Sequence, residues 1–408
     1  MRTTTPKKIA SLLALCLALT VFVTVPAAAQ NFTWNGNGFN ANWSVGENWN
    51  GDVAPSPEVF NGTLTFSGSS RLVNFNDIEG LSITNLVLNT SSWNISGNAL
   101  QLFPSGNAIE IGAGLHSTIA NDITVMTTGK TLQTGSTGAG SLTLSGSFNA
   151  GANEIRKDGT GSSVIFNGNG KTVTMGLFVV RKGFITFTNG VAATLSSLQI
   201  GNDGNQVGIV NVGGDDTSVH ASASIETGRN TGSNEGRLNV SGGTVSANIL
   251  LTGQNAGTLN TSGIYQSGGI IKANNLRAAN NGPSMIQVSG GTMIITNGNE
   301  SSTTYGLHQN GSSVLTISGD GEVIIGTGDN QKWNLAAGAA SGTLNLNGGT
   351  LSVFGFTKMN ASATTIINLD GGTLRSLGNA ADWLNDLANT TVNVGNGGAV
   401  IDNNGFAI

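Results

Sequence analysis

The chain has 408 residues, of which 61 are glycine and only 10% are charged, and its formal net charge is −5. An acidic, weakly charged chain lacks the clustered positive face that nucleic-acid binding requires. Such a composition can indicate disorder, but Val, Ile and Leu recur here in short alternating segments, which predicts an ordered all-β fold. The one helical pattern lies at Ala380 to Ala388.

The segment 1–29 has the pattern of a secretory signal peptide. Arg2, Lys7 and Lys8 form a positive start, residues 9–25 are an apolar run, and residues 27–29 are alanines that supply a cleavage site. The alternative is an N-terminal anchor helix, which the short run and the small residues after it disfavour. We therefore expect a Sec-type exported protein that is secreted or held at the cell surface, with the bacterial outer surface favoured.

Cys16 is the only cysteine and lies inside this segment. A lipoprotein is disfavoured, because Leu15 stands where a lipobox has a small residue. The mature chain would therefore have no disulfide and no cysteine ligand for a metal. No later stretch is long and apolar enough to cross a membrane.

Residues 30–110 are rich in tryptophan and are predicted to hold an N-terminal cap and the first strands. Trp34, Trp43 and Trp49 lie in a polar, glycine-rich setting. Tryptophans of this kind can form a flat platform on which sugars stack, so these three are possible glycan contacts. A second, compatible interpretation is a cap over the open end of a repeat fold, where unpaired strand edges need cover.

Residues 111–408 repeat one pattern, in which a short alternating strand enters a glycine turn and a second strand follows. Examples are RLNVSGGTV at 237–245 and TLNLNGGTL at 343–351. The first glycines of eleven such turns follow one another at a mean interval of about 25 residues. These glycines are Gly146, Gly168, Gly190, Gly213, Gly242, Gly268, Gly290, Gly319, Gly348, Gly371 and Gly397.

A period in the twenties fits one coil of a right-handed parallel β-helix of eleven or more rungs. With rungs about 4.8 Å apart, eleven rungs make a rod on the order of 50 Å long. Alternate strand residues would face inward, so Leu344 with Leu346, and Ile286 with Val288, are expected in the core. The turn glycines are spaced most widely near 213–242 and 290–348, where the sequence leaves the register open.

Stacked side chains are a further expectation of this period. Turn asparagines such as Asn167, Asn189 and Asn347 would form ladders that stabilise the rod. The pairs Arg156-Lys157 and Arg181-Lys182 are one period apart in the sequence, so they could stack into a small basic ladder that touches an acidic polysaccharide. The alternative for the basic pairs is two exposed turns.

Other repeat architectures fit less well. A leucine-rich repeat needs a lattice of leucine and asparagine that is missing, and a propeller blade needs about 40 residues. The calcium-binding β-roll needs tandem GGxGxD motifs, and the nearest approach, residues 213–216, occurs once. A tandem of β-sandwiches remains the main alternative.

These motifs resemble a known group. The spacing W-x8-W-x5-W with the strand-like GTLTFSG at 62–68, the stretch EIRKDGTGSSVIFNGNG at 154–170 and the tail INLDGGTLRS at 367–376 look like autotransporter-associated β-strand repeat proteins of the planctomycete or verrucomicrobial type. The resemblance covers nearly the whole mature chain. It implies a passenger-like β-helix displayed on or shed from the cell, and it implies no catalytic residues.

The family resemblance also implies a C-terminal translocator barrel or a sorting signal, and the sequence ends at Ile408 without either. We therefore expect the C-terminus to be truncated, and free secretion is the alternative.

A β-helix can host an enzyme, and a lyase would place carboxylates and a base on adjacent rungs. The weak candidate cluster is Asp203, Asp215, Asp216 and Glu226, where Asp203 and Glu226 lie close to one period apart and could stack. The alternative is that all four are solvated turn residues. A glycosidase would need two facing carboxylates, for which residues 320 and 322 are the nearest pair.

The remaining chemistry is sparse. His116, His220 and His308 are far apart in sequence and lack zinc-ligand spacing. We find no nucleophile elbow and no phosphate-binding loop. No catalytic residue, metal or cofactor is therefore predicted.

The sequence favours an exported structural or adhesive surface protein that presents a β-helical rod. Its expected partners are extracellular polysaccharide or cell-surface components, not nucleic acid, and its oligomeric state stays open. The alternatives are a lyase-like, polysaccharide-active enzyme on the same fold and a glycan-binding module that uses the N-terminal tryptophans.

Overall fold

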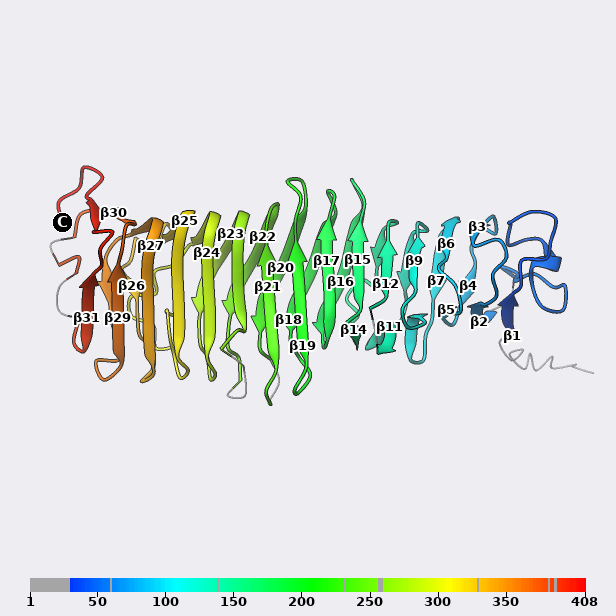
Figure 1. Ribbon diagram of the computed structural model, residues 1–408, viewed down its shortest axis with the longest axis horizontal. Coiled ribbons are helices and arrows are strands. Elements are labelled where there is room, and N and C mark those ends of the chain that lie inside the picture. Colours follow the sequence, from blue (N-terminus) through cyan, green and yellow to red (C-terminus); the bar gives the residue numbers. More distant parts are fainter. Residues whose placement is uncertain are drawn as a thin grey trace, which may run out of the picture.

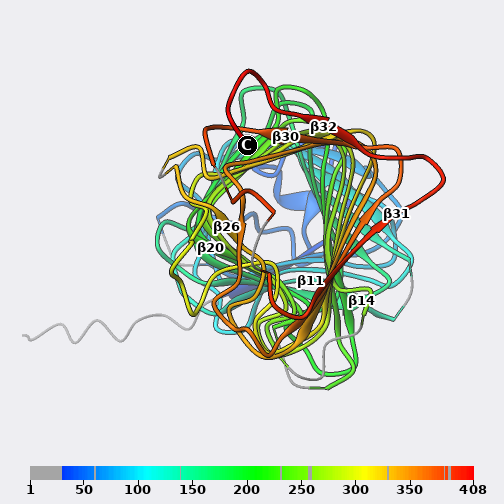
Figure 2. The ribbon, with the colours of Figure 1, turned by 90° about the vertical axis from the view of Figure 1, so that its left-hand side faces the viewer.

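The protein is a long parallel β-solenoid of about 13 turns with almost no helix. The computed structural model describes residues 30–408 except 59–60, 138, 230–231, 256–259, 329, 381 and 385–386. Figure 1 shows the rod from the side, with its rungs stacked along the long axis. Figure 2 looks along that axis from the C-terminal end, where successive rungs superimpose. The prediction of an all-β parallel β-helix is confirmed, and the predicted signal peptide lies outside the described residues.

The elements of the N-terminal half are short. They are β1 (Gln30–Trp34), the 3-10 helix η1 (Gly46–Asn48), β2 (Asn61–Phe66), β3 (Val73–Asn76), β4 (Ser82–Ile83), β5 (Leu86–Leu88), β6 (Asn94–Gly97), β7 (Leu100–Leu102), β8 (Asn107–Ile111), β9 (His116–Ile119), β10 (Ile123–Val125), β11 (Lys130–Thr137), β12 (Ser141–Leu144), β13 (Phe148–Asn149), β14 (Ile155–Thr160), β15 (Ser163–Asn167), β16 (Thr172–Val180) and β17 (Gly183–Thr188).

Strands of the C-terminal half include the longest in the rod. They are β18 (Ala192–Ile200), β19 (Val207–Val212), β20 (Ser218–Thr227), β21 (Glu235–Val240), β22 (Thr244–Leu251), β23 (Gly263–Arg277), β24 (Ser284–Ile295), β25 (Ser313–Ile325), β26 (Trp333–Asn334), β27 (Ser341–Val353), β28 (Phe356–Thr357), β29 (Thr364–Leu369), β30 (Thr373–Ser376), β31 (Thr390–Val394) and β32 (Val400–Asp402).

Apolar side chains stack in columns along the inside of the rod. Leu344, Leu346, Ile286 and Val288 are all buried, as predicted. The register places Ile286 next to Leu315 and then Leu344, while Val288 is followed by residue 317 and Leu346. Each rung therefore covers the apolar residues of the one before it, which removes them from water without any disulfide.

The solenoid begins earlier in the chain than the glycine turns indicated. Leu64 stacks on Leu86, which stacks on Ile109, which stacks on Leu132. Residues 61–110 therefore already belong to the rungs, and the irregular cap is confined to the segment between β1 and β2. The sequence predicted only a cap and first strands in this segment, because its turns do not follow the regular glycine spacing.

The widest intervals between turn glycines lengthen loops and leave the stacked strands in register. Val288, Ile317 and Leu346 are aligned partners although each lies more than the mean period from the next. The additional residues lie in connecting segments such as 296–312 and 326–340. In the segment Ala380 to Ala388, where the sequence suggested a helix, none of the described residues is helical, and residues 382–384 and 388 are turns.

Candidate functional site

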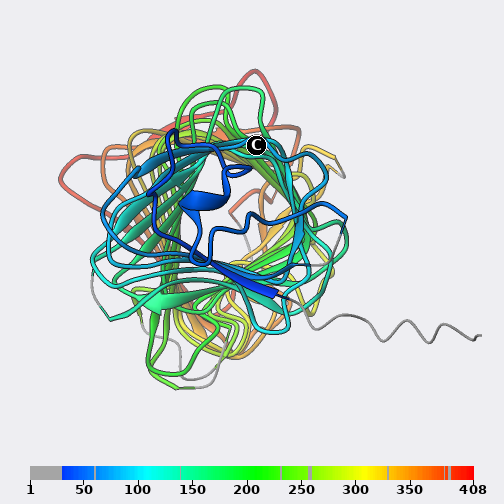
Figure 3. The ribbon, with the colours of Figure 1, turned by 90° about the vertical axis from the view of Figure 1, so that its right-hand side faces the viewer.

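The three predicted glycan contacts form the core of the cap. Trp34, Trp43 and Trp49 each have 0% of their surface exposed. The Trp49 ring meets Trp34 edge-on with centroids 5.1 Å apart and Trp43 at 5.9 Å, and its Nε1 donates a hydrogen bond to the Trp43 carbonyl at 2.7 Å. A sugar ring cannot stack on a face that other rings cover, so the platform interpretation is corrected. The segment instead lies across the N-terminal opening of the rod, as Figure 3 shows in blue.

Asp203 and Glu226 do not stack as their spacing in the sequence suggested. The register places Glu226 beside Gln199, because β20 is already offset from β18 by 26 residues at Ala192↔Ser218 and a bulge in β20 adds one more. Glu226 accepts a hydrogen bond from Ser224 Oγ at 2.8 Å and forms an ion pair with Arg229. Asp203 lies beyond the end of β18, in a turn, and its carboxylate faces other cations. The expected alignment of the two carboxylates is therefore corrected.

Asp215 and Asp216 are exposed turn residues beside a shallow hollow of about 380 Å³ that Asn169 and Asn189 also line. They share no hydrogen bond or ion pair with Asp203 or Glu226 in the described part of the chain. Among the described residues, no three His, Cys, Asp or Glu side chains are grouped so that they could hold a metal ion. The acidic cluster is thus dispersed: Asp203 lies after β18, Asp215 and Asp216 share one turn, and Glu226 is a buried residue of strand β20.

The predicted basic ladder is replaced by a buried lysine and a surface charge network. Lys157 pairs with Val180 in the register, not with Lys182, and its side chain is fully buried. Arg181 Nη1 and Lys182 Nζ lie 3.0 and 3.2 Å from the Asp158 carboxylate. The same two cations lie 3.5 and 3.8 Å from Asp203. These four side chains neutralise one another, so they do not present a free basic face.

Four oxygen atoms surround the Lys157 ammonium group, an arrangement we call the Lys157 cage. Nζ donates to the carbonyls of Asp158 at 2.8 Å, Gly159 at 3.1 Å and Lys182 at 3.3 Å, and to Ser162 Oγ at 3.2 Å. Burial lowers the pKa of Lys157 to about 7; the negative charge of Asp158 opposes this shift and Lys182 adds to it. The cage joins two neighbouring rungs and is inaccessible to a substrate.

The two surface histidines make the same contact with the next rung. His116 Nδ1 lies 2.9 Å from Ser141 Oγ, and His220 Nδ1 lies 2.9 Å from Ser246 Oγ. In both cases the serine is the aligned partner in the neighbouring strand. Because the solenoid register produces both contacts, a Ser–His pair here does not by itself indicate a nucleophile.

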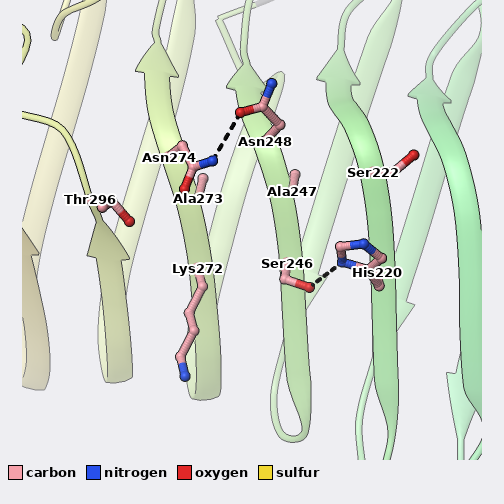
Figure 4. A pocket seen from close by; sticks show the side chains of 9 residues that line it. All are labelled: His220, Ser222, Ser246, Ala247, Asn248, Lys272, Ala273, Asn274 and Thr296. Carbon is pink, nitrogen blue, oxygen red and sulfur yellow. Dashed lines mark hydrogen bonds between the residues drawn. The ribbon is translucent and has the colours of Figure 1, made fainter. Parts of the chain in front are cut away.

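A polar groove of about 430 Å³ crosses β20, β22 and β23 and reaches the residue after β24. We call it the β20–β24 groove, and Figure 4 shows its side chains. One row along the rod is His220, Ser246 and Lys272, which are register partners. A second contains Asn248 and Asn274, joined by a hydrogen bond of 3.0 Å. Its lining residues are His220, Ser222, Ser246, Ala247, Asn248, Lys272, Ala273, Asn274 and Thr296.

Sequence reasoning missed this groove because each rung contributes only a few ordinary polar residues to it. The detectable signal was the constant interval from His220 to Ser246 and from Ser246 to Lys272, which is one rung each time. No catalytic motif marks such a row.

His308 is the third histidine, and it is fully buried. Its Nε2 lies 3.4 Å from Thr365 Oγ1, and the ring packs so closely on Gly342 that a Cβ there would overlap it. Burial, together with a smaller effect of the Lys358 charge, lowers the pKa of His308 from its ordinary value of 6.5 to about 4. The folded protein therefore holds this ring neutral.

Acid should destabilise the protein through His308. Below pH 6.5 His308 binds a proton in the unfolded chain, whereas in the folded chain it binds one only near pH 4. The free energy of unfolding therefore falls as the pH is lowered from 6.5 to 4. We expect a loss of about 3 kcal/mol. Urea unfolding of wild type and His308→Gln between pH 7.5 and 4 should show the difference between them change by this amount. His116→Gln is the exposed control, and a flat difference for His308→Gln would contradict the assignment.

Within the part of the chain that the structure describes, no helix has the length and apolar character to cross a membrane. No protein-family model, no curated protein and no solved structure matches this chain.

Proposed function

We propose that the protein is an exported rod that works by contact, as a structural or adhesive surface protein, without a catalytic step. The observation that supports this best is a row of outward amide and hydroxyl groups aligned along the rod. Asn345 Nδ2 donates to Thr316 Oγ1 at 3.2 Å, its Oδ1 accepts from Asn368 at 2.7 Å, and Asn393 donates to Asn368 at 2.9 Å. Each of these rungs repeats the same kind of donor and acceptor.

Such a row suits an extended polymer more than a small substrate. Neighbouring rungs lie about 4.8 Å apart, so a polysaccharide lying along the rod meets hydrogen-bonding groups at regular steps. Each contact is weak, but many contacts on one chain add through high effective concentration. The predicted asparagine stacking is confirmed at Asn167 and Asn189, whose side chains are 2.7 Å apart, so these rows also stiffen the rod.

A lyase-like enzyme on the same fold is the second candidate. It needs carboxylates and a base together in a groove, and the groove described above holds His220 and Lys272 without a carboxylate. Asp203 faces Arg181 and Lys182. Contact without turnover is therefore the better account of these residues.

The two candidates separate in one experiment. The purified protein is passed over immobilised acidic and neutral polysaccharides, and the chain length of the retained polymer is measured before and after incubation. Retention with unchanged chain length is the expected result. Shortened polymer with new reducing or unsaturated ends would support the enzyme, and no retention of any polymer would contradict adhesion to polysaccharide.

A further inference from the structure

We propose that the β20–β24 groove is the binding site for an acidic polysaccharide, which lies along the rod axis with its carboxylate groups directed at Lys272. This inference rests on the proposed function and names the surface and the ligand class.

The groove coincides with a local change in the core. One column of inward-facing register partners begins with Leu195 on β18 and ends with Ile295 on β24. On the three rungs between these two strands, the residue in this column is alanine. These alanines are Ala221, Ala247 and Ala273. Alanine fills less of a close-packed core than leucine or isoleucine, and the groove lies over the rungs that carry these alanines. The groove runs along the rod from β20 to the end of β24.

The charge of the groove is positive although the chain is acidic. Lys272 is exposed and forms no ion pair in the described part of the chain. No Asp or Glu lines the groove. The four cations of the earlier rungs, in contrast, are not free to bind an anion. Arg156, Arg181 and Lys182 each form an ion pair with a carboxylate, and Lys157 is buried. An unpaired cation attracts an anionic ligand from solution.

The other lining groups match sugar hydroxyls. Asn248 and Asn274 provide amides, while Ser222, Ser246 and Thr296 provide hydroxyls that can donate or accept. Lys272 and His220 are two rungs apart, on the order of 10 Å, so one extended chain can reach both. The groove presents no aromatic ring other than the His220 imidazole, so recognition relies on hydrogen bonds and charge, which favours a uronate polymer over a neutral one.

Polygalacturonate is the test probe, and neutral galactan is its uncharged comparison. Binding is measured by biolayer interferometry with immobilised protein at low and high salt. Lys272→Gln removes the cation and should weaken polygalacturonate binding about five-fold while reducing its salt dependence. Lys130→Gln, which changes the net charge equally but lies outside the groove, should leave affinity within about two-fold of wild type. Ser246→Trp places a ring in the middle of the groove and should weaken binding by roughly ten-fold or more.

The outcomes separate the groove from the broader proposal. Weakening by Lys272→Gln and Ser246→Trp but not by Lys130→Gln supports the site. Equal weakening by the two lysine variants, or unchanged binding by Ser246→Trp, overturns the groove assignment and leaves the adhesive rod standing. Retention of galactan without retention of polygalacturonate also overturns the groove assignment and leaves the adhesive rod standing. If neither polymer nor any other polysaccharide is retained, both proposals are overturned.

Discussion

Replacing Trp49 with alanine is expected to open the N-terminal end of the rod and to cost about 3–5 kcal/mol in the free energy of unfolding of that end. The Trp49 ring contacts Phe32, Trp34, Trp43 and Phe66 edge-on, at centroid distances between 5.1 and 6.0 Å. Its removal leaves a cavity at the centre of this cluster, and the first strands lose their cover. Hydrogen exchange should show faster exchange in β1, β2 and β5.

The effect should stay local, because each rung of a solenoid contacts mainly its neighbours. Strands β23 to β27 should keep their wild-type protection. Phe39→Ala is the matched control, since Phe39 lies in the same segment but is 81% exposed, and it should change little. Aggregation of Trp49→Ala would agree with an uncovered sheet edge. Unchanged exchange in β1 and β2 would contradict the assignment of Trp49 to the cap core.

Replacing Lys157 with alanine is expected to cause the second large loss in the free energy of unfolding. The change removes the ammonium group of the Lys157 cage. It leaves the buried carbonyl oxygen of Gly159 and the part-buried carbonyl oxygens of Asp158 and Lys182 without that donor. Buried acceptors that lose their partner cost about 1–3 kcal/mol each, and the lost lysine stem leaves a cavity. We expect about 3 kcal/mol of destabilisation in urea unfolding, whereas the exposed Lys272→Ala should be near neutral.

The pH dependence of the free energy of unfolding is an independent test of the Lys157 environment. The folded pKa is about 7 and the unfolded value is 10.5, so between these values the unfolded chain binds a proton that the folded chain does not. The free energy of unfolding of wild type should therefore rise from pH 7 to pH 10 relative to Lys157→Met, which cannot titrate. Below pH 7 the difference should be constant. A difference that falls with pH would mean that the cage favours the charged amine.

The sequence by itself determined the class of fold. Its regular period, its alternating strands and its glycine turns predicted a parallel β-helix, and they identified Leu344 and Ile286 as core residues. This succeeded because inward and outward positions alternate strictly along a strand, and because repeated rungs show the same pattern many times. Residues 30–110 lack that redundancy, because their turns do not follow the regular glycine spacing, and the sequence therefore predicted only a cap and first strands there.

The candidate site was decided by the tertiary structure. Polar side chains on different rungs meet only through the register. The long rung between β18 and β20, together with a bulge in β20, places Glu226 beside Gln199 and away from Asp203. Burial was likewise invisible in the sequence, where the polar residues around Trp49 suggested exposure although neighbouring rings enclose it.

The β20–β24 groove coincides with alanines at one core position of three rungs. Its row of His220, Ser246 and Lys272 exists because the solenoid brings residues one rung apart to neighbouring positions. Local patterns specify strands, whereas a site on a solenoid depends on how many residues each loop and bulge inserts between them.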